Sequence, residues 1–133
     1  MKLDEICAFL SPKLLSLLRI VSALVILQFG LTKLFGFPFF EGLSNQPVFS
    51  LYWFAAIIEL VGGLLMLVGF ATRIAAFVLS GEMAVAYFIE HAPQNFFPLL
   101  NEGNLAVMFC FVFLYLAAAG GGPWSLDALR GRR

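Results

Sequence analysis

Long apolar runs separated by short polar segments dominate the chain. Four of these runs are long enough to form helices, and they cover residues 14–35, 51–70, 74–89 and 104–119. At about 1.5 Å rise per residue, the first two cross about 30 Å of hydrocarbon, whereas the last two would stand nearly upright or thin the bilayer. The pattern predicts an all-α integral membrane four-helix bundle, with residues 1–133 forming one domain.

Composition supports a membrane location. The chain is 62% hydrophobic and only 12% charged, whereas a soluble domain carries roughly one quarter charged residues. A large soluble helical core is the alternative, but too few charges remain to cover it. The eight basic and eight acidic residues balance, so no overall field attracts nucleic acid, and the expected partner is the lipid bilayer.

The segment before the first apolar run reads LDEICAFLSP. It predicts a short amphipathic helix at the membrane interface that stops at Pro12, with a frayed tail as the alternative. A cleaved secretory signal is disfavoured, because Asp4 and Glu5 interrupt a basic leader.

Basic residues predict the orientation. In a four-span arrangement only Lys33 falls on one side, and the remaining basic residues fall on the other: Lys2, Lys13, Arg19, Arg73, Arg130, Arg132 and Arg133. The asymmetry predicts a protein of the cytoplasmic (inner) membrane with both termini cytoplasmic. Arg19 lies inside the first span, close enough to snorkel to the surface.

Short connections predict how the helices follow one another. In the link GFATR, Gly69 suits the left-handed position after a helix and Thr72 suits a helix cap. Such a short link makes the second and third spans antiparallel neighbours. Ser125 is expected to cap a final short helix with Asp127 in its first turn.

Polar residues gather in one half of the bundle. Glu59 lies ten residues before Gly69, and Glu82 lies ten residues after Thr72, so both carboxyls are expected about 15 Å above the turn. Gln28 is expected near the same level. Further polar residues follow towards the outer surface: Lys33, His91, Asn95, Glu102 and Asn104.

Two interpretations of these polar residues stay open. In the first they only pack the helices, with Lys33 paired to one glutamate and Gln28 hydrogen-bonded to the other. In the second they form a site that handles protons or a polar headgroup, in which two adjacent carboxyls do not both ionise. Gly62 and Gly63 allow either a helix or a flat ligand to approach.

A metal site is not predicted. His91 is the single histidine, so a metal ion would need Glu90, Glu102 and ligands from outside the chain.

Five stretches together resemble the DoxX family of small four-span membrane proteins. They are GLTK (30–33), ELVGGLLMLVGFATR (59–73), EMAVAYFIEH (82–91), FFPLLNEGNLA (96–106) and GGGPWSLD (120–127). The resemblance covers nearly all of the chain from Arg19 onwards. The last stretch departs from the more usual Gly-x-Gly followed by an aromatic residue.

The resemblance implies a redox-associated role, since the family name is shared with the membrane subunits of a thiosulfate:quinone oxidoreductase. We therefore expect a subunit of a quinone-linked system, with a redox partner protein or a homo-oligomer. No cofactor is evident in the chain, and a quinone is the candidate ligand. Glu59 and Glu82 are the candidate catalytic residues, and the expected ligand-binding residues are Gln28, Lys33, Glu59, Gly62, Gly63, Glu82, His91 and Glu102.

Two other functions are consistent with the residues. One is a non-enzymatic membrane scaffold or assembly factor. The other, less favoured, is a small proton-coupled transporter, because four-span exporters of that kind carry an essential glutamate in their first helix, where this chain has Arg19, Gln28 and Lys33. The residues alone do not decide whether the chain is an enzyme.

Overall fold

The computed structural model describes residues 2–131, and within that range the regular secondary structure is entirely helical. The elements are α1 (Leu3–Phe35), α2 (Leu51–Val68), α3 (Thr72–Ala86), the π-helical turn η1 (Tyr87–His91), α4 (Pro98–Asn101), α5 (Asn104–Ala119) and α6 (Leu126–Leu129). The predicted all-α fold is confirmed.

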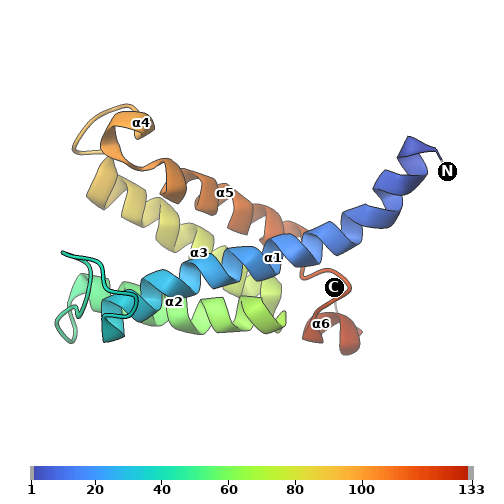
Figure 1. The fold of residues 1–133 in the computed structure, drawn as a ribbon, viewed down its shortest axis with the longest axis horizontal. Coiled ribbons are helices and arrows are strands. Elements are labelled where there is room, and N and C mark those ends of the chain that lie inside the picture. Colours follow the sequence, from blue (N-terminus) through green and yellow to red (C-terminus); the bar gives the residue numbers. More distant parts are fainter. Residues whose placement is uncertain (1, 132–133) are drawn as a thin grey trace.

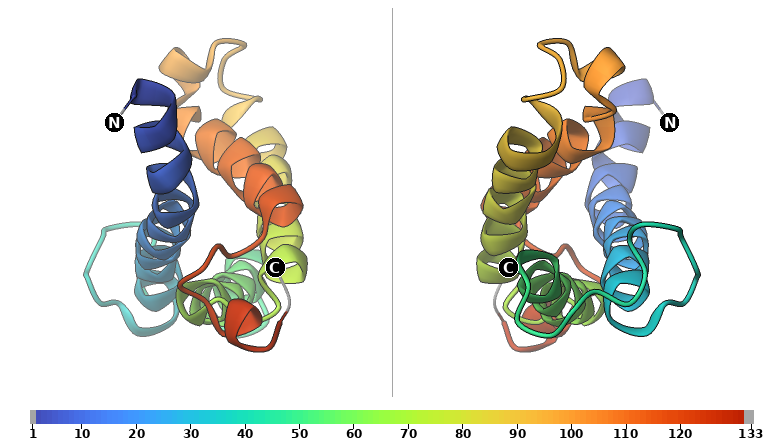
Figure 2. Two further views of the ribbon diagram at one scale, coloured as in Figure 1. Left: turned by 90° about the vertical axis from the view of Figure 1, so that its right-hand side faces the viewer. Right: turned by 90° about the vertical axis from the view of Figure 1, so that its left-hand side faces the viewer.

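The four long helices form two pairs. α1 packs along α2, α3 packs along α5, and a smaller α2–α3 contact joins the pairs. We call the end that holds both termini and the α2–α3 turn the terminal end, and the opposite end, with residues 36–50 and 92–103, the loop end. The two pairs lie close together near the terminal end and diverge towards the loop end (Figures 1 and 2).

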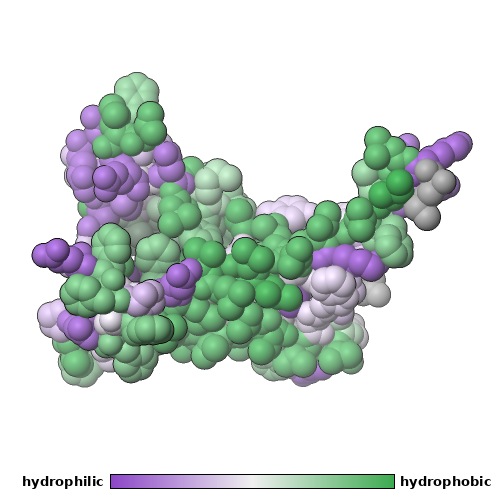
Figure 3. Space-filling view, in the orientation of Figure 1, coloured by the Kyte–Doolittle hydropathy of each residue, from purple (hydrophilic) through white to green (hydrophobic). Residues whose placement is uncertain are grey.

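The surface of the bundle suits a lipid environment. Hydrophobic residues cover the middle of the molecule, and hydrophilic residues gather towards its two ends (Figure 3). Many large apolar side chains point outwards, among them Leu24, Val61, Ile74 and Phe111. α1, α2 and the continuous segment Thr72–His91 are long and apolar enough to cross a membrane, and α5 is shorter, with 16 residues. The chain is therefore a multi-pass membrane protein.

The predicted helix boundaries agree best with the structure for α5 and for the end of α2. α5 covers the predicted residues 104–119, and α2 ends at Val68, just before Gly69 with φ of 72°. The expected stop at Pro12 is wrong, because α1 runs through it from Leu3. Proline removes one backbone donor and bends a helix, and Figure 1 shows α1 curving in its N-terminal part.

Three parts of the chain are clasped together at the terminal end. The Arg19 side chain is 1% exposed, and its guanidinium donates hydrogen bonds to the carbonyls of Gly121 and Trp124, the second at 2.7 Å. The Ser16 hydroxyl donates to the Gly121 carbonyl and accepts from the Trp124 N–H, both at 3.1 Å. Arg19 thus holds the segment after α5 instead of snorkelling to the surface, because buried carbonyls need donors.

Asp127 extends this clasp to the α2–α3 turn. Its carboxylate accepts from the backbone N–H groups of Ala71 and Thr72, each at 2.9 Å, and its own N–H donates to the Gly69 carbonyl at 2.8 Å. The predicted Ser125 cap of α6 is confirmed. The predicted Thr72 cap is wrong, because Ala71 occupies the N-cap position and a carboxylate distant in sequence takes over the capping.

The environment of Asp127 favours its ionised form. Desolvation alone would raise the pKa of Asp127. The backbone donors of Thr72 and Ala71 and the charge of Arg130 outweigh it, so the pKa lies below the ordinary value. The carboxylate also complements the positive end of the α3 dipole.

Asp127→Asn is expected to lower the free energy of unfolding by about 1 kcal/mol at neutral pH, as for a lost helix cap. Because the folded-state pKa is depressed, the wild-type contribution is fully present above the ordinary aspartate pKa, about 4, and is lost as pH falls through the folded value. The difference in Tm between wild type and variant should therefore shrink between pH 7 and pH 3. Asp4→Asn, which removes an exposed carboxylate, is the control, and a difference independent of pH would contradict the assignment.

Candidate functional site

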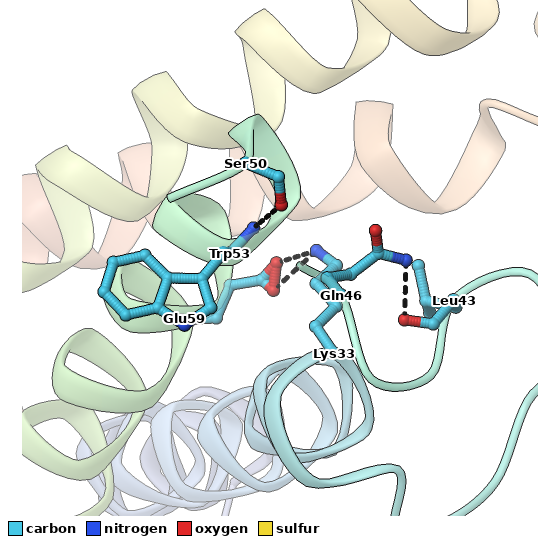
Figure 4. Close-up of polar contacts among 6 residues, drawn as sticks. All are labelled: Lys33, Leu43, Gln46, Ser50, Trp53 and Glu59. Atoms are coloured by element: carbon cyan, nitrogen blue, oxygen red, sulfur yellow. Dashed lines mark hydrogen bonds and ion pairs between the residues drawn. The ribbon is translucent and has the colours of Figure 1, made fainter. Parts of the chain in front are cut away.

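A buried ion pair joins α1 to α2. Lys33 lies in the last turn of α1, and Glu59 lies near the middle of α2. The Lys33 Nζ contacts both carboxylate oxygens of Glu59, with a distance of 3.0 Å to Oε2 (Figure 4). Glu59 is 0% exposed and Lys33 8%. Each charge therefore depends on the other, since an unpaired buried charge in an apolar bundle is strongly unfavourable.

The loop of residues 36–50 fixes the position of Lys33. Gly36, with φ of 69°, ends α1 and donates to the Thr32 carbonyl, and the backbone N–H of Gln46 donates to the Lys33 carbonyl at 2.7 Å. The Gln46 side chain donates to the Leu43 carbonyl at 2.9 Å, and the chain then enters α2 (Figure 4). The returning loop thus ties the end of α1 to the start of α2.

Glu82 of α3 completes a three-residue group. Its carboxyl lies beside that of Glu59 and within the field of the Lys33 ammonium. Glu82 Oε2 is buried and has no hydrogen-bond partner among the described residues. The equal depth predicted for Glu59 and Glu82 thus corresponds to two neighbouring carboxyls, of which Glu59 contacts the Lys33 ammonium directly.

A cavity of about 500 Å³ lies between the two helix pairs towards the loop end. Its inner walls are mostly apolar, with Ile26 and Phe29 from α1 and Phe109 from α5, and Lys33 and Glu59 lie in the wall. Polar residues gather around its other side: Glu41, Tyr52, Glu90, His91 and Glu102. This combination suits a molecule with a flat apolar body and polar atoms, as in many small-molecule sites.

Two of these polar residues belong to the π-helical turn η1. It spans Tyr87–His91, directly after α3, and both Glu90 and His91 line the cavity. The His91 Nδ1 lies 2.9 Å from the carbonyl oxygen of Asn101, and Glu90 interacts with the Tyr52 hydroxyl of α2. Single π-helical turns occur frequently at functional sites, and this one places neighbouring residues on the same cavity.

Asn101 holds the loop between η1 and α5. Its side chain is 0% exposed, and its Nδ2 donates to Tyr87 Oη at 3.2 Å and to the Asn95 carbonyl at 2.9 Å. Its Oδ1 accepts from the Gly103 N–H at 2.8 Å. The loop-end wall of the cavity is therefore fixed by one buried amide.

The structure separates the predicted site residues into three groups. Lys33, Glu59, His91 and Glu102 line the cavity, and Glu82 lies behind Glu59 in a second, adjoining cavity. Gln28 is exposed on the outside of α1 and lines neither cavity; its depth in the bundle said nothing of the direction in which it points.

The two predicted glycines serve helix packing. A Cβ at Gly62 would lie 3.0 Å from Leu79 Cγ of α3, and one at Gly63 would lie 2.8 Å from Leu27 Cγ of α1. Both positions therefore bring α2 close to its neighbours, as small residues do in membrane bundles, and neither lines a cavity.

Sequence reasoning missed Glu41, Tyr52 and Glu90 as cavity residues. Glu41 lies in a loop whose path no local pattern predicts, and Glu90 reaches the cavity through a π-helical turn without a recognisable sequence signal. Among the described residues no group of three or more His, Cys, Asp or Glu side chains is arranged to hold a metal ion.

Comparisons with known proteins place the chain among its relatives. The DoxX family model matches residues 14–92. An uncharacterized protein of Haemophilus influenzae is 40% identical over 123 residues, which cover 87% of this chain and 90% of that protein. No solved structure matches. The matched residues include Lys33, Glu59, Glu82, Glu90 and His91. Because the family model covers more than half of the chain, the chain belongs to the DoxX family.

Proposed function

We propose that the protein is a four-span subunit of a quinone-linked redox system in the cytoplasmic (inner) membrane, and that its larger cavity binds the quinone headgroup. The basic residues near the terminal end, such as Lys13, Arg73 and Arg130, support a cytoplasmic location of both termini. The loop end, with the cavity, then lies in the outer half of the membrane.

The observation that carries the proposal is the Lys33–Glu59 pair in the wall of a largely apolar cavity. A quinone headgroup is flat and apolar with two carbonyl oxygens. Its ring fits against side chains such as Phe29 and Phe109, and the Lys33 Nζ can donate to a carbonyl oxygen and stabilise developing negative charge there.

Quinone reduction to the quinol takes up two electrons and two protons. In this proposal a redox partner protein supplies both electrons. One ammonium balances one carboxylate, so the second carboxyl of the buried group is the one expected to carry a proton, at Glu82 Oε2. Glu82 gives its proton to the Glu59 carboxylate, which passes it to a quinone oxygen. Glu90 and His91 at the loop end then return a proton to Glu82, and the second proton follows the same route.

A second candidate function is a membrane scaffold without a ligand. The close packing at Gly62 and Gly63 and the direct Lys33–Glu59 contact favour it, because both also hold helices together. The two functions differ in what the cavity contains.

The deciding experiment is native mass spectrometry with lipid extraction on gently purified protein. We expect wild type to retain a quinone and Glu59→Gln to lose it, since the neutral amide no longer fixes the Lys33 ammonium at the cavity wall. Gln28→Leu, on the lipid-facing side of α1, should retain it. Glu82→Gln leaves the ion pair intact and should therefore also retain the quinone.

A ligand-free wild type, or equal quinone content in wild type and Glu59→Gln, would contradict the proposed function and favour the scaffold.

A further inference from the structure

A second cavity of about 300 Å³ lies between α2 and α3. Its walls are almost entirely apolar, with Leu51, Phe54 and Ile58 from α2 and Val78, Gly81 and Val85 from α3. Leu51, Phe54, Val78 and Val85 are each 48% exposed or more. The cavity is therefore a groove on the apolar outer surface, and we call it the α2–α3 groove.

The α2–α3 groove adjoins the larger cavity. Lys33, Tyr52, Met83, Ala86 and Glu90 line both. Glu59 lines only the larger cavity and Glu82 only the groove, so the buried charged group forms the partition between them. Because Lys33 lines both spaces, a molecule that contacts Lys33 lies next to each of them.

The two spaces offer different surroundings to an apolar chain. The larger cavity is bordered at the loop end by Glu41, Glu90, His91 and Glu102, and an apolar tail leaving past these residues would meet charged groups and water. Each methylene group exposed in this way costs about 0.8 kcal/mol. The α2–α3 groove instead runs along α3 from Val78 to Ile89, roughly 16 Å at helical rise, and keeps a tail in hydrocarbon.

We infer that the α2–α3 groove is the binding site for the apolar tail of the ligand, and that the ligand enters sideways from the membrane between α2 and α3. The inference rests on the proposed function and narrows its substrate class to tailed, membrane-dissolved molecules. The head lies at Lys33 in the larger cavity, and the tail leaves over Met83 and Ala86 along the groove.

Gly81 provides a sharp test of the groove. A Cβ built at Gly81 meets nothing within 4 Å, and Gly81 lines the groove, so we expect a larger side chain there to occupy the groove rather than press on a neighbouring helix. This distinguishes Gly81 from Gly62, where a Cβ would press on Leu79 of α3. Gly81→Ala is the matched control, because it adds one methyl group to open space.

The experiment compares two benzoquinones with the same head, one without a tail and one with a decyl tail. Their dissociation constants, expressed per lipid, are measured by fluorescence titration in nanodiscs. Gly81→Leu is expected to weaken binding of the decyl quinone roughly tenfold, because the added side chain takes the place of the tail and removes its van der Waals contacts with the groove. The tailless quinone should bind Gly81→Leu and wild type within a factor of about two.

A second pair of variants tests the groove independently, in case Gly81→Leu does not fold. Val85→Trp in the groove should reproduce the effect of Gly81→Leu, whereas Ile74→Trp, at an exposed α3 position outside both cavities, should not. Unchanged decyl-quinone binding in both groove variants would overturn the tail site while leaving the proposed function standing. Equal weakening of both quinones would also overturn it, and a wild type that binds neither quinone would overturn the proposed function and the inference together.

Discussion

Lys33→Met is expected to lower the free energy of unfolding by about 3–5 kcal/mol, the usual result of removing one partner of a buried ion pair. The variant leaves the Glu59 carboxyl, which is 0% exposed, beside Glu82 with no cation between them. The loss is measured by reversible unfolding in mixed micelles or by steric trapping in bicelles. Lys13→Met is the control, because the Lys13 ammonium contacts the carbonyl and ring of Phe9 in the same helix, and its removal should cost less than about 1 kcal/mol.

The double variant Lys33→Met, Glu59→Met separates the charge effect from the packing effect. It removes the unpaired carboxylate, and buried ion pairs replaced by apolar side chains are often as stable as the original. We expect most of the lost stability to return while quinone binding stays absent. Additive losses from the two single changes would show that the groups are energetically independent, contrary to their direct contact.

This charged group shows how far sequence reasoning reaches in a membrane bundle. Ten residues on either side of one tight turn placed Glu59 and Glu82 at the same depth, because helical rise is constant. One of the two open interpretations paired Lys33 with a glutamate, because a lone charge in hydrocarbon has a high free energy. Both expectations depend on how deep a residue lies in the membrane, and this depth can be counted from its position along the helix.

The sequence does not tell which side of each helix faces the interior of the bundle. Gln28 has nearly the depth of the charged group, but it lies on the exposed side of α1. Gly62 and Gly63 lie on the same face of α2 as Glu59, but the neighbouring Leu79 and Leu27 fill the space above them. In these cases the partner helix, rather than the local sequence, decides whether a residue faces a cavity.

Irregular backbone and contacts between distant segments are a second feature that the sequence did not predict. Pro12 lies inside α1, Asp127 rather than Thr72 caps α3, and a π-helical turn brings Glu90 to the cavity. Each feature depends on contacts between distant segments. The stretches that resemble the DoxX family accordingly divide between the two ends of the bundle. Gly69, Ser125 and Asp127 lie in the clasp, and Lys33, Glu59 and Glu82 lie at the cavities.

Arg19→Met is expected to lower the free energy of unfolding by about 2–4 kcal/mol, since it removes the donors from two carbonyls in a buried setting. The Trp124 carbonyl loses the Arg19 hydrogen bond, whereas the Gly121 carbonyl keeps the hydroxyl of Ser16. Arg19→Lys should recover only part of the loss, because an ammonium lacks the planar fork of the guanidinium. Unfolding in mixed micelles measures the change, with Lys13→Met as the control, because Lys13 is a basic residue of the same helix that bonds the Phe9 carbonyl and lies outside the clasp.

The location of the defect distinguishes the clasp from the ligand site. Arg19 and Lys33 are fourteen residues apart on α1, about 21 Å along its axis. In the Arg19 variants, amide hydrogen exchange should therefore become faster at Ala71, Thr72 and Asp127, whose amides the clasp protects. A folded Arg19→Lys protein should keep the quinone affinity of wild type. Faster exchange at the loop end, or quinone loss in that variant, would show that the two ends are coupled and that Arg19 acts beyond the clasp.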